Sequence, residues 1–457
     1  MSNTIANWLR SRKFKSALKQ SDTRVAKQLL QEIQNSGAKL SWLEKLFRDK
    51  LQSDECAYES EREVAAARRQ LTEVRQNLEA EFSFSKLQFE ESLRQRSQKL
   101  FEPTESFLLT PNSDYIKFVI QQFKILDIDD RIIQCTGIDS NIFKPLEIKL
   151  AEYLDNGFNN YKDQKKFFND LKIADEDINY LKKGKDPDYK YNLTPHIYFI
   201  RYFLEGVYSA YLAWFLVYKS GLLKANINVL DIGAGSGAML YGLSSFLQSI
   251  DSFSSLSQIH ISYCSFEQQD LLQYHGLKFW RRYAKEQKTP AVNSYLRFYT
   301  NDVFKYDNND TVTEKLPKNF FDFIVISHCI FANQDERYKS HEVYRKIFSE
   351  SLKDEGYVLV VVQGSRLFQA YGSRITEDKN HEDSLINKFV QELGLKLVWH
   401  QYLTSTGQRT SLGSEFGKYA REKLPPQEYI SELARKYKIV NYDLHYALDD
   451  YVILAQK

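Results

Sequence analysis

The 457-residue chain contains 43% hydrophobic and 27% charged residues, which is an ordinary composition for a soluble globular protein. This length exceeds what a single hydrophobic core usually serves, so we expect two or three domains. A net charge of +2 excludes any argument for nucleic-acid binding from the chain as a whole, although residues 1–40 hold eight basic residues against two acidic ones.

The four cysteines argue against two common frameworks. Cys56, Cys135, Cys264 and Cys329 are scattered without CxxC spacing, so neither a disulfide scaffold nor a zinc site is predicted, and we expect no bound metal. This usage fits a reduced intracellular compartment. No apolar segment follows the basic N-terminus, so no signal peptide is predicted and a cytoplasmic location is expected.

The first predicted elements are two short helices over residues 4–18 and 23–36. Asp22 or Thr23 is suited to cap the second helix at its start, and Gly37 is suited to end it. The basic residues of this helical pair are compatible with a solvated surface. They are also compatible with binding phosphate, lipid headgroups or an acidic protein.

A long helix is predicted next, because no Gly or Pro occurs between Gly37 and Pro103. Steps of three and four positions alternate between the apolar residues Val64, Ala67, Leu71, Val74 and Leu78. This is the pattern of a coiled coil or a long helical hairpin, although Phe82 breaks the heptad. Residues 1–102 are therefore predicted as a helical N-terminal region whose apolar stripe packs within its own domain or serves self-association or partner binding.

Residues 103–190 are predicted as a mostly helical connector domain, and the polar loop 182–191 separates it from a third domain over residues 191–457. The most apolar stretch of the chain, Gly206–Tyr218, lies in a predicted helix over Ile197–Lys219. Its 13 residues are fewer than the roughly 20 that a membrane span needs. We therefore predict a buried helix and no transmembrane segment.

From there, helical and extended patterns alternate to the C-terminus. Seven strands are predicted, at Asn228–Ile232, Ile259–Phe266, Leu296–Thr300, Phe321–Ser327, Tyr357–Gln363, Lys396–Leu403 and Tyr451–Ala455. Alternating strands and helices predict an α/β fold with a doubly wound, mostly parallel sheet. A late strand beside the C-terminus can insert antiparallel.

The strongest motif is the segment Val229–Leu240, VLDIGAGSGAML. A buried strand carries Asp231, and Gly233, Gly235 and Gly237 follow at alternate positions. Glycines let the backbone turn sharply and approach a ligand closely, and the next helix offers free N–H groups at its start. A loop at the carboxyl end of a central strand is also where open α/β sheets bind ligands.

This segment resembles motif I of the class I, Rossmann-like S-adenosylmethionine-dependent methyltransferases. The resemblance covers about residues 197–457 and implies a seven-stranded sheet whose last strand is antiparallel. It implies that Asp231 helps to bind the methionine ammonium group. The same loop satisfies the dinucleotide fingerprint if Ala238 takes its last position, so a nicotinamide oxidoreductase is the competing interpretation.

Three later strand ends extend the resemblance. Glu267 comes directly after a strand and implies a carboxylate for the ribose hydroxyls, although it follows Gly233 by 34 positions rather than by the usual distance of about 20. Asp302 with Val303 implies a site for the adenine ring and its amine. The segment after Ser327 lacks the [DN]PP[YF] motif of amino methyltransferases and carries His328, a candidate general base.

The resemblance therefore predicts a methyltransferase whose acceptor is a protein, an RNA or a small molecule. The alternative is a non-catalytic or weakly catalytic assembly factor, of the ribosome or photosystem type, on the same fold. Nucleic-acid binding is not excluded. The implied cofactor-binding residues are Asp231, Gly233, Ala234, Gly235, Gly237, Glu267, Gln268, Asp302, Val303 and Ser327.

Overall fold

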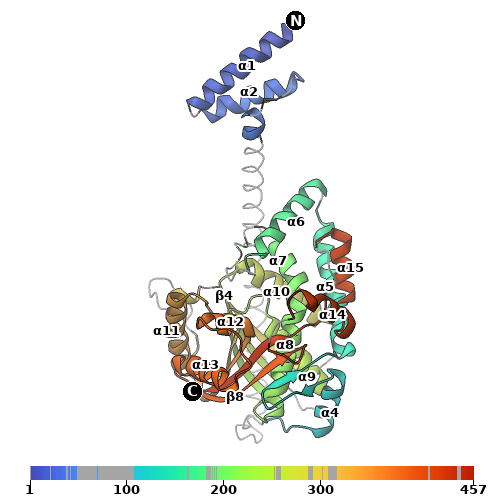
Figure 1. Ribbon diagram of the computed structural model, residues 1–457, viewed down its shortest axis with the longest axis vertical. Helices are drawn as coiled ribbons and strands as arrows, with labels where there is room; N and C mark the ends of the chain where they lie inside the picture. The colour runs from blue at the N-terminus through green and yellow to red at the C-terminus, as the bar shows by residue number, and fades with distance from the viewer. Residues whose placement is uncertain are drawn as a thin grey trace, which may run out of the picture. The chain divides into compact units, whose positions relative to one another are not determined.

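The computed structural model describes residues 2–20, 22–37, 40–41, 43–48, 69 and, with short gaps, 108–457 (Figure 1). The gaps after residue 108 are 162–163, 182–186, 188, 190, 192, 252, 254–258, 287–291, 301, 307–315, 410–411 and 440–443. The residues on which the predicted heptad seam depends lie outside the described residues: Val64, Ala67, Leu71, Val74, Leu78 and Phe82. The chain divides into two compact units, Met1–Ala66 and Ala67–Lys457.

In unit 1 (Met1–Ala66), helices α1 (Ser2–Lys19) and α2 (Thr23–Asn35) follow one another closely. Asp22 caps α2, because its side chain accepts a hydrogen bond from the backbone N–H of Val25 at 3.1 Å. Gly37 has a φ of +72°, the left-handed conformation that commonly ends a helix. A small apolar cluster, Phe14, Ala17, Ala26 and Leu30, is buried in this unit.

Unit 2 (Ala67–Lys457) is built on one sheet of nine strands rather than the seven predicted. The strands are β1 (Leu126–Asp127), β2 (Ile132–Gln134), β3 (Asn226–Ile232), β4 (Ile259–Glu267), β5 (Val292–Thr300), β6 (Phe321–Ser327), β7 (Leu352–Gln363), β8 (Lys396–Thr404) and β9 (Asp449–Gln456). The seven predicted strands correspond to β3–β9, and the sheet has two more because β1 and β2, two and three residues long, are too short to show a periodic pattern. They come from the predicted connector and extend the sheet beyond β8.

The order of the strands is β1-β2-β8-β9-β7-β6-β3-β4-β5. The pairs from β5 to β7 are parallel, whereas β9 is antiparallel to both β7 and β8. The expected antiparallel insertion of the last strand is therefore confirmed. The chain continues from β3 to β4 on one side, and β6 pairs with the other side of β3, so the sheet is doubly wound about β3.

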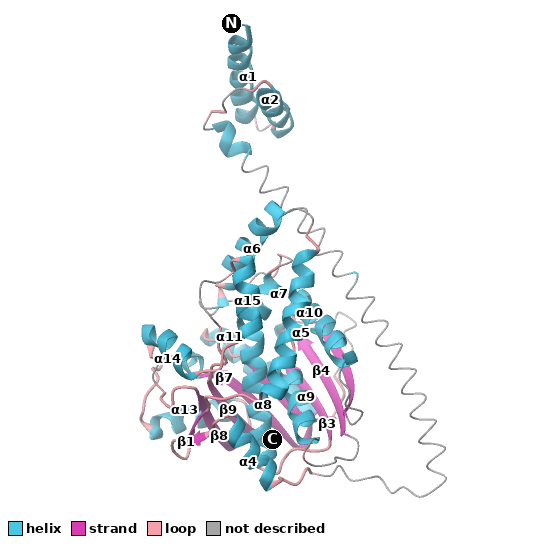
Figure 2. Cartoon of the chain, turned by 90° about the vertical axis from the view of Figure 1, so that its right-hand side faces the viewer, coloured by secondary structure: helices cyan, strands magenta, loops and turns pink. Residues whose placement is uncertain are grey.

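Helices cover both faces of this sheet (Figure 2). One face of the sheet is covered by α4 (Ser113–Gln122), α5 (Ser140–Asn159), α6 (Gln164–Ile178), α7 (Thr194–Tyr198), η2 (Phe199–Phe203), α8 (Leu204–Lys219), α9 (Ala238–Asp251), α10 (Asp270–Glu286) and α15 (Glu428–Tyr437). The opposite face carries α11 (Gln334–Ser351), α12 (Gly364–Ala370) and α13 (Lys379–Glu392). The described helices of unit 2 also include η3 (Val303–Lys305), η4 (Gly413–Glu415) and α14 (Phe416–Lys423).

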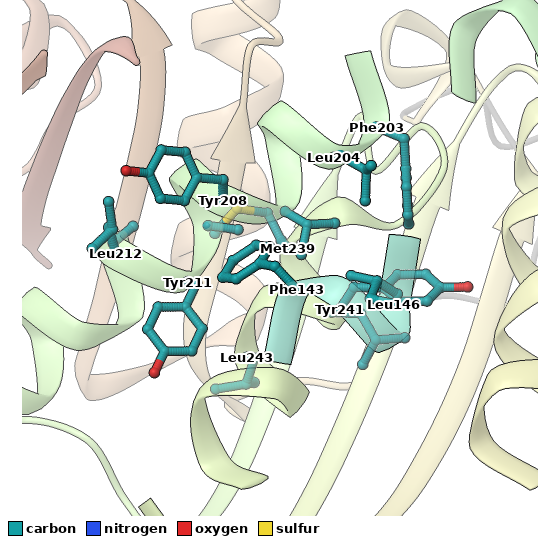
Figure 3. Packing of buried hydrophobic residues seen from close by; sticks show 14 of the residues in the cluster. Phe143, Leu146, Phe203, Leu204, Tyr208, Tyr211, Leu212, Met239, Tyr241 and Leu243 are labelled. Atoms are coloured by element: carbon teal, nitrogen blue, oxygen red, sulfur yellow. The ribbon is translucent and has the colours of Figure 1, made fainter. Parts of the chain in front are cut away.

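Alternate residues of each central strand serve the two faces, as the period of two in a strand requires. In β3, Val229 belongs to the cluster under α8 and α9, whereas Leu230 and Ile232 belong to the cluster under α11 and α13. The first cluster includes Tyr208 and Tyr211 from α8 with other side chains of α5 and α9 (Figure 3). The sheet core is thus closed from both sides.

The apolar stretch Gly206–Tyr218 lies within α8, where every residue from Val207 to Tyr218 is buried. This confirms the prediction of a buried helix. Among the described helices, none combines the length and the apolar character that a membrane crossing requires. Residues 103–190, predicted as a separate connector, contribute α4, α5, α6 and two strands to unit 2, and the predicted domain borders stay predictions.

Candidate functional site

The doubly wound sheet has a switch point at β3, whose two neighbours are β4 and β6. At such a point the connections leave the sheet in opposite directions, which opens a crevice at the carboxyl ends of the strands. The segments at the carboxyl ends of these strands are residues 233–237, 267–269 and 327–329. The fold therefore brings the glycine loop, Glu267 and Ser327 to the same edge of the sheet.

The glycine loop adopts a backbone that side chains rarely tolerate. Gly233, Gly235 and Gly237 have φ angles of +68°, +55° and +83°. A Cβ on Gly233 would lie 2.7 Å from Sγ of Cys329, whereas a Cβ on Gly237 would meet nothing within 4 Å. The loop is anchored to β4, because the backbone N–H of Gly233 donates to the carbonyl of Phe266 at 2.8 Å.

Asp231 lies one residue before the end of β3 and is fully buried. One carboxylate oxygen, Oδ2, accepts a hydrogen bond from the hydroxyl of Tyr263, whereas Oδ1 has no partner among the described residues. The pKa of Asp231 is raised to about 7, chiefly by burial and to a smaller extent by the nearby charge of Glu267, whereas the hydrogen bond from Tyr263 lowers it. This arrangement suits a cationic group whose N–H would donate a hydrogen bond to Oδ1 of Asp231.

Glu267 ends β4 with its side chain buried beside the glycine loop. Its Oε2 accepts from the backbone N–H of Gly235 and its Oε1 from that of Gln269, both at 2.7 Å. Glu267 is therefore joined to the loop that the sequence pattern singled out. Gln268, which follows it, is exposed.

A second unpartnered polar atom lies inside the glycine loop. Ser236 is 3% exposed, and its Oγ has no partner among the described residues. It lines a small cavity of about 20 Å³ with Ser265, Gln273 and other residues of β4, α9 and α10. Ser265 differs from Ser236, because its Oγ accepts from Nε2 of Gln273 at 3.1 Å.

Asp302 and Val303 lie after β5, two strands away from β3. Asp302 caps the short helix η3 by accepting from the backbone N–H of Phe304 at 3.0 Å. Val303 packs against the cluster under α11 and α13. The ring of Phe304 is 37% exposed and lies 5.0 Å from the ring of Phe331, which places two aromatic rings at this end of the edge.

Ser327 ends β6, and His328 follows it with a φ of +55°. The backbone N–H of His328 donates to the carbonyl of Val361 at 2.8 Å, and its Nε2 lies 3.9 Å from Oδ1 of Asp450. The half-exposed imidazole thus lies at the carboxyl end of β6. A positive φ is uncommon for a residue with a side chain and is found where the surroundings impose it.

Sequence reasoning missed four residues at this edge: Tyr198, Tyr263, Cys329 as the neighbour of Gly233, and Asp450. The hydroxyl of Tyr198 lies 3.6 Å from the position that a Cβ on Gly235 would take. These residues come from α7, β4, the turn after β6 and β9, and none belongs to a motif. The sequence offered one weak signal for Tyr263, which is its position in a predicted strand next to the strand that carries Asp231.

No family model and no curated protein matches the chain. Solved structures that resemble it are S-adenosylmethionine-dependent methyltransferases. One from Methanosarcina mazei has a TM-score of 0.29 at 13% identity and covers 52% of this chain and 96% of its own. Loganic acid methyltransferase with SAH has a TM-score of 0.31 at 7% identity, covering 57% and 96%. Likenesses this low carry no argument about what the chain binds.

Proposed function

We propose that the chain is an S-adenosylmethionine-dependent methyltransferase. The single observation that supports it best is the buried carboxylate of Asp231 beside a glycine loop at the switch point of the sheet, because one of its oxygens has no partner within the described part of the chain. An uncompensated buried polar atom costs free energy, so a fold keeps it where a ligand completes it. The ammonium group of the cofactor's methionine moiety has the required charge and donors.

In this proposal the residues at the edge hold the cofactor as follows. Asp231 accepts from the ammonium group, and Gly233, Ala234, Gly235 and Gly237 allow the close approach of the backbone. Glu267 with Gln268 binds the ribose hydroxyls, for which its carboxylate exchanges its present backbone donors. Asp302 accepts from the adenine amine, and Val303 packs along the ring.

The bound cofactor supplies an activated methyl group on a sulfonium. The chain then has to align the acceptor with that methyl group and keep water away from it. Ser327 lies at the end of β6, where the acceptor side of the crevice would be, and His328 offers an imidazole that takes up a proton from the acceptor. The proposal covers protein, RNA and small-molecule acceptors.

Isothermal titration of the full chain with S-adenosylhomocysteine tests cofactor binding. We expect binding by the native chain and its loss in Gly235→Asp, which puts a carboxylate against the ligand. Gly394→Asp is the matched control: Gly394 also has a positive φ, +70°, but precedes β8 and so lies at the opposite edge of the sheet. This control is expected to bind normally. Tight binding of NAD without a response to S-adenosylhomocysteine would overturn the proposal.

Cofactor binding alone does not separate an active enzyme from an assembly factor on the same fold. Incubation of the chain with S-adenosylmethionine labelled in its methyl group, together with fractionated cell extract, makes that distinction. Label that enters a macromolecular or small-molecule fraction with the native chain but not with Gly235→Asp supports transfer. Cofactor binding without any transferred label supports the assembly role.

A further inference from the structure

Two acidic residues of β9 lie at the edge of the sheet that carries the glycine loop. Because β9 runs antiparallel to β7, its first residues, Asp449 and Asp450, lie where β7 ends, and Asp450 pairs with Gln363. Successive residues of a strand point to opposite faces of the sheet. Asp450 therefore points to the face under α8 and α9, which Val452 and Leu454 of the same strand also serve.

The two carboxylates differ in their partners. Asp449 accepts hydrogen bonds from the hydroxyl of Tyr402 and from Nε2 of Gln363, the latter at 3.4 Å. Asp450 is only 8% exposed, yet its carboxylate accepts no hydrogen bond from any residue that the structure describes. Its Oδ1 lies 3.9 Å from Nε2 of His328, which is beyond hydrogen-bond length. The fold thus leaves a buried carboxylate incompletely compensated.

Glu205 brings another carboxylate to Asp450 from helix α8. It lies in the first turn of α8, and this turn packs on the start of α9, because a Cβ on Gly206 would lie 3.2 Å from Cβ of Ala238. Burial raises the pKa of Glu205 to about 8, with a smaller contribution from the charge of Asp450. Within the described ranges, no cation or hydrogen-bond donor pairs with Glu205. Two carboxylates without a lysine or arginine partner there thus lie beside the glycine loop.

We propose that Asp450 and Glu205 bind the cationic nitrogen of an amine, and that this amine is the methyl acceptor. The inference rests on the proposed function and specifies its acceptor. An ammonium group carries three N–H donors and one positive charge, so it can donate to both carboxylates and offset their repulsion.

The half-exposed imidazole of His328 is placed to take up the proton that the amine has to lose. The nitrogen passes this proton to Nε2 of His328, and its freed lone pair bonds to the methyl carbon. The electron pair of the carbon–sulfur bond stays on the sulfur, so charge and atoms balance. The imidazolium that forms lies 3.9 Å from Oδ1 of Asp450, whose negative charge stabilises it.

Other acceptor groups fit this edge less well. A phosphate or carboxylate group would meet the negative charges of Asp450 and Glu205 rather than hydrogen-bond donors. A hydroxyl group brings a single donor and no charge, so it would leave the carboxylates largely uncompensated. An amine supplies both the donors and the charge.

Saturation-transfer NMR of the full chain with n-butylammonium chloride tests the binding step, with 1-butanol as the neutral and butyrate as the anionic isostere. The titrations are run with and without S-adenosylhomocysteine, so they do not depend on cofactor binding. We expect butylammonium to bind more tightly than either isostere. Asp450→Asn should weaken its binding about 10- to 100-fold, because a hydrogen bond between charged groups is lost. Glu205→Gln, a second variant at the same site, should also weaken it.

The matched control is Asp354→Asn, which removes the same charge near the amino end of β7, at the opposite edge of the sheet, where the side chain of Asp354 is 87% exposed. It is expected to keep the native affinity for butylammonium, and circular dichroism checks the fold of all three variants. Equal binding of the amine and the alcohol would overturn the inference, as would native affinity in both Asp450→Asn and Glu205→Gln.

The chemical linkage of a transferred methyl group gives a second test. Label that the native chain transfers into cell extract should remain bound after mild base, because N-methyl groups withstand a treatment that releases methanol from methyl esters. Release as methanol would overturn the inference. A native chain that fails to bind S-adenosylhomocysteine refutes the proposed function, whereas such binding without a preference for the amine refutes this inference alone.

Discussion

Two buried carboxylates in the same unit are treated in opposite ways. Glu382 on α13 is fully buried, and its oxygens accept from Nε and Nη2 of Arg409 at 3.0 and 2.6 Å and from the hydroxyl of Tyr451. Asp231 on β3 is buried just as completely, but Oδ1 has no partner among the described residues. Both oxygens of Glu382 thus have hydrogen-bond partners within the fold, whereas Asp231, at the switch point, has a described partner for one oxygen alone.

The difference separates a structural group from a candidate binding group. A buried charge with its counter-charge and hydrogen bonds belongs to the architecture, and removing one partner is costly. A buried polar atom without a partner weakens the fold, and natural proteins accept such losses chiefly at functional sites. The four predictions that follow test this contrast, from the largest expected effect to the smallest.

Breaking the completed pair should cost the most. Glu382→Gln leaves the buried guanidinium of Arg409 without its counter-charge, and we expect the free energy of unfolding to fall by about 3–5 kcal/mol. Denaturant titration measures it. Glu377→Gln is the control: Oε2 of Glu377 lies 3.8 Å from Nη1 of Arg409 with its side chain 60% exposed, so its loss should stay below about 1 kcal/mol. Equal effects of the two variants would contradict the contrast.

Asp231→Asn should change the free energy of unfolding in the opposite direction and make the chain more stable. The pKa of Asp231 is about 7 in the fold against a reference value of 3.8, so the folded state favours the protonated form. Its contribution to stability is present below about pH 4 and is lost as the pH rises through about 7. Near pH 8 the free energy of unfolding of the Asn variant should therefore be roughly 2–4 kcal/mol larger than that of the native chain.

Unfolding curves of both proteins near pH 4 and pH 8 check this expectation, and the difference should shrink at the lower pH. The same variant should bind S-adenosylhomocysteine about 10- to 100-fold more weakly, because a hydrogen bond to a charged group is lost. An Asn variant that is less stable than the native chain at pH 8 would show that Asp231 is a structural group.

Alanine substitutions at the loop glycines should differ in their cost to stability, because the space around each glycine differs. Gly233→Ala combines a left-handed φ of +68° with a Cβ only 2.7 Å from Sγ of Cys329, and we expect a loss of about 2–3 kcal/mol. Gly237→Ala carries the backbone strain alone and should lose about 1 kcal/mol. Thermal unfolding compares them. The Cβ of Cys329 would lie 2.8 Å from the added Cβ as well, so adding Cys329→Gly, which removes both atoms, should recover part of the Gly233→Ala loss, and no recovery would argue against the close contact.

The smallest effect concerns two serines that line one cavity. Ser236→Ala removes a buried hydroxyl that has no partner in the described segments, and it should stabilise the chain by about 0.5–1 kcal/mol. Ser265→Ala removes the acceptor of a hydrogen bond from Gln273 and should destabilise it by about 1 kcal/mol. Opposite signs in parallel denaturant titrations support the contrast, whereas a loss in both variants would refute it.

The sequence by itself determined the parts of the molecule that depend on local patterns. The alternation of strands and helices, the buried helix around Gly206–Tyr218 and the glycine loop after β3 all follow from periodicity and glycine spacing, which act over a few residues. The carboxyl ends of parallel strands meet at one edge, so Asp231, Glu267 and Ser327 could be assigned to one site.

Only the tertiary structure decided which distant residues complete that edge. Tyr263 donates to Asp231 because β3 and β4 pair in register, and Asp450 reaches His328 because β9 inserts beside β7. Likewise, β1 and β2 join the sheet through pairing with β8 despite their short length. Such contacts depend on strand register and packing between segments far apart in the chain, and no local pattern encodes them.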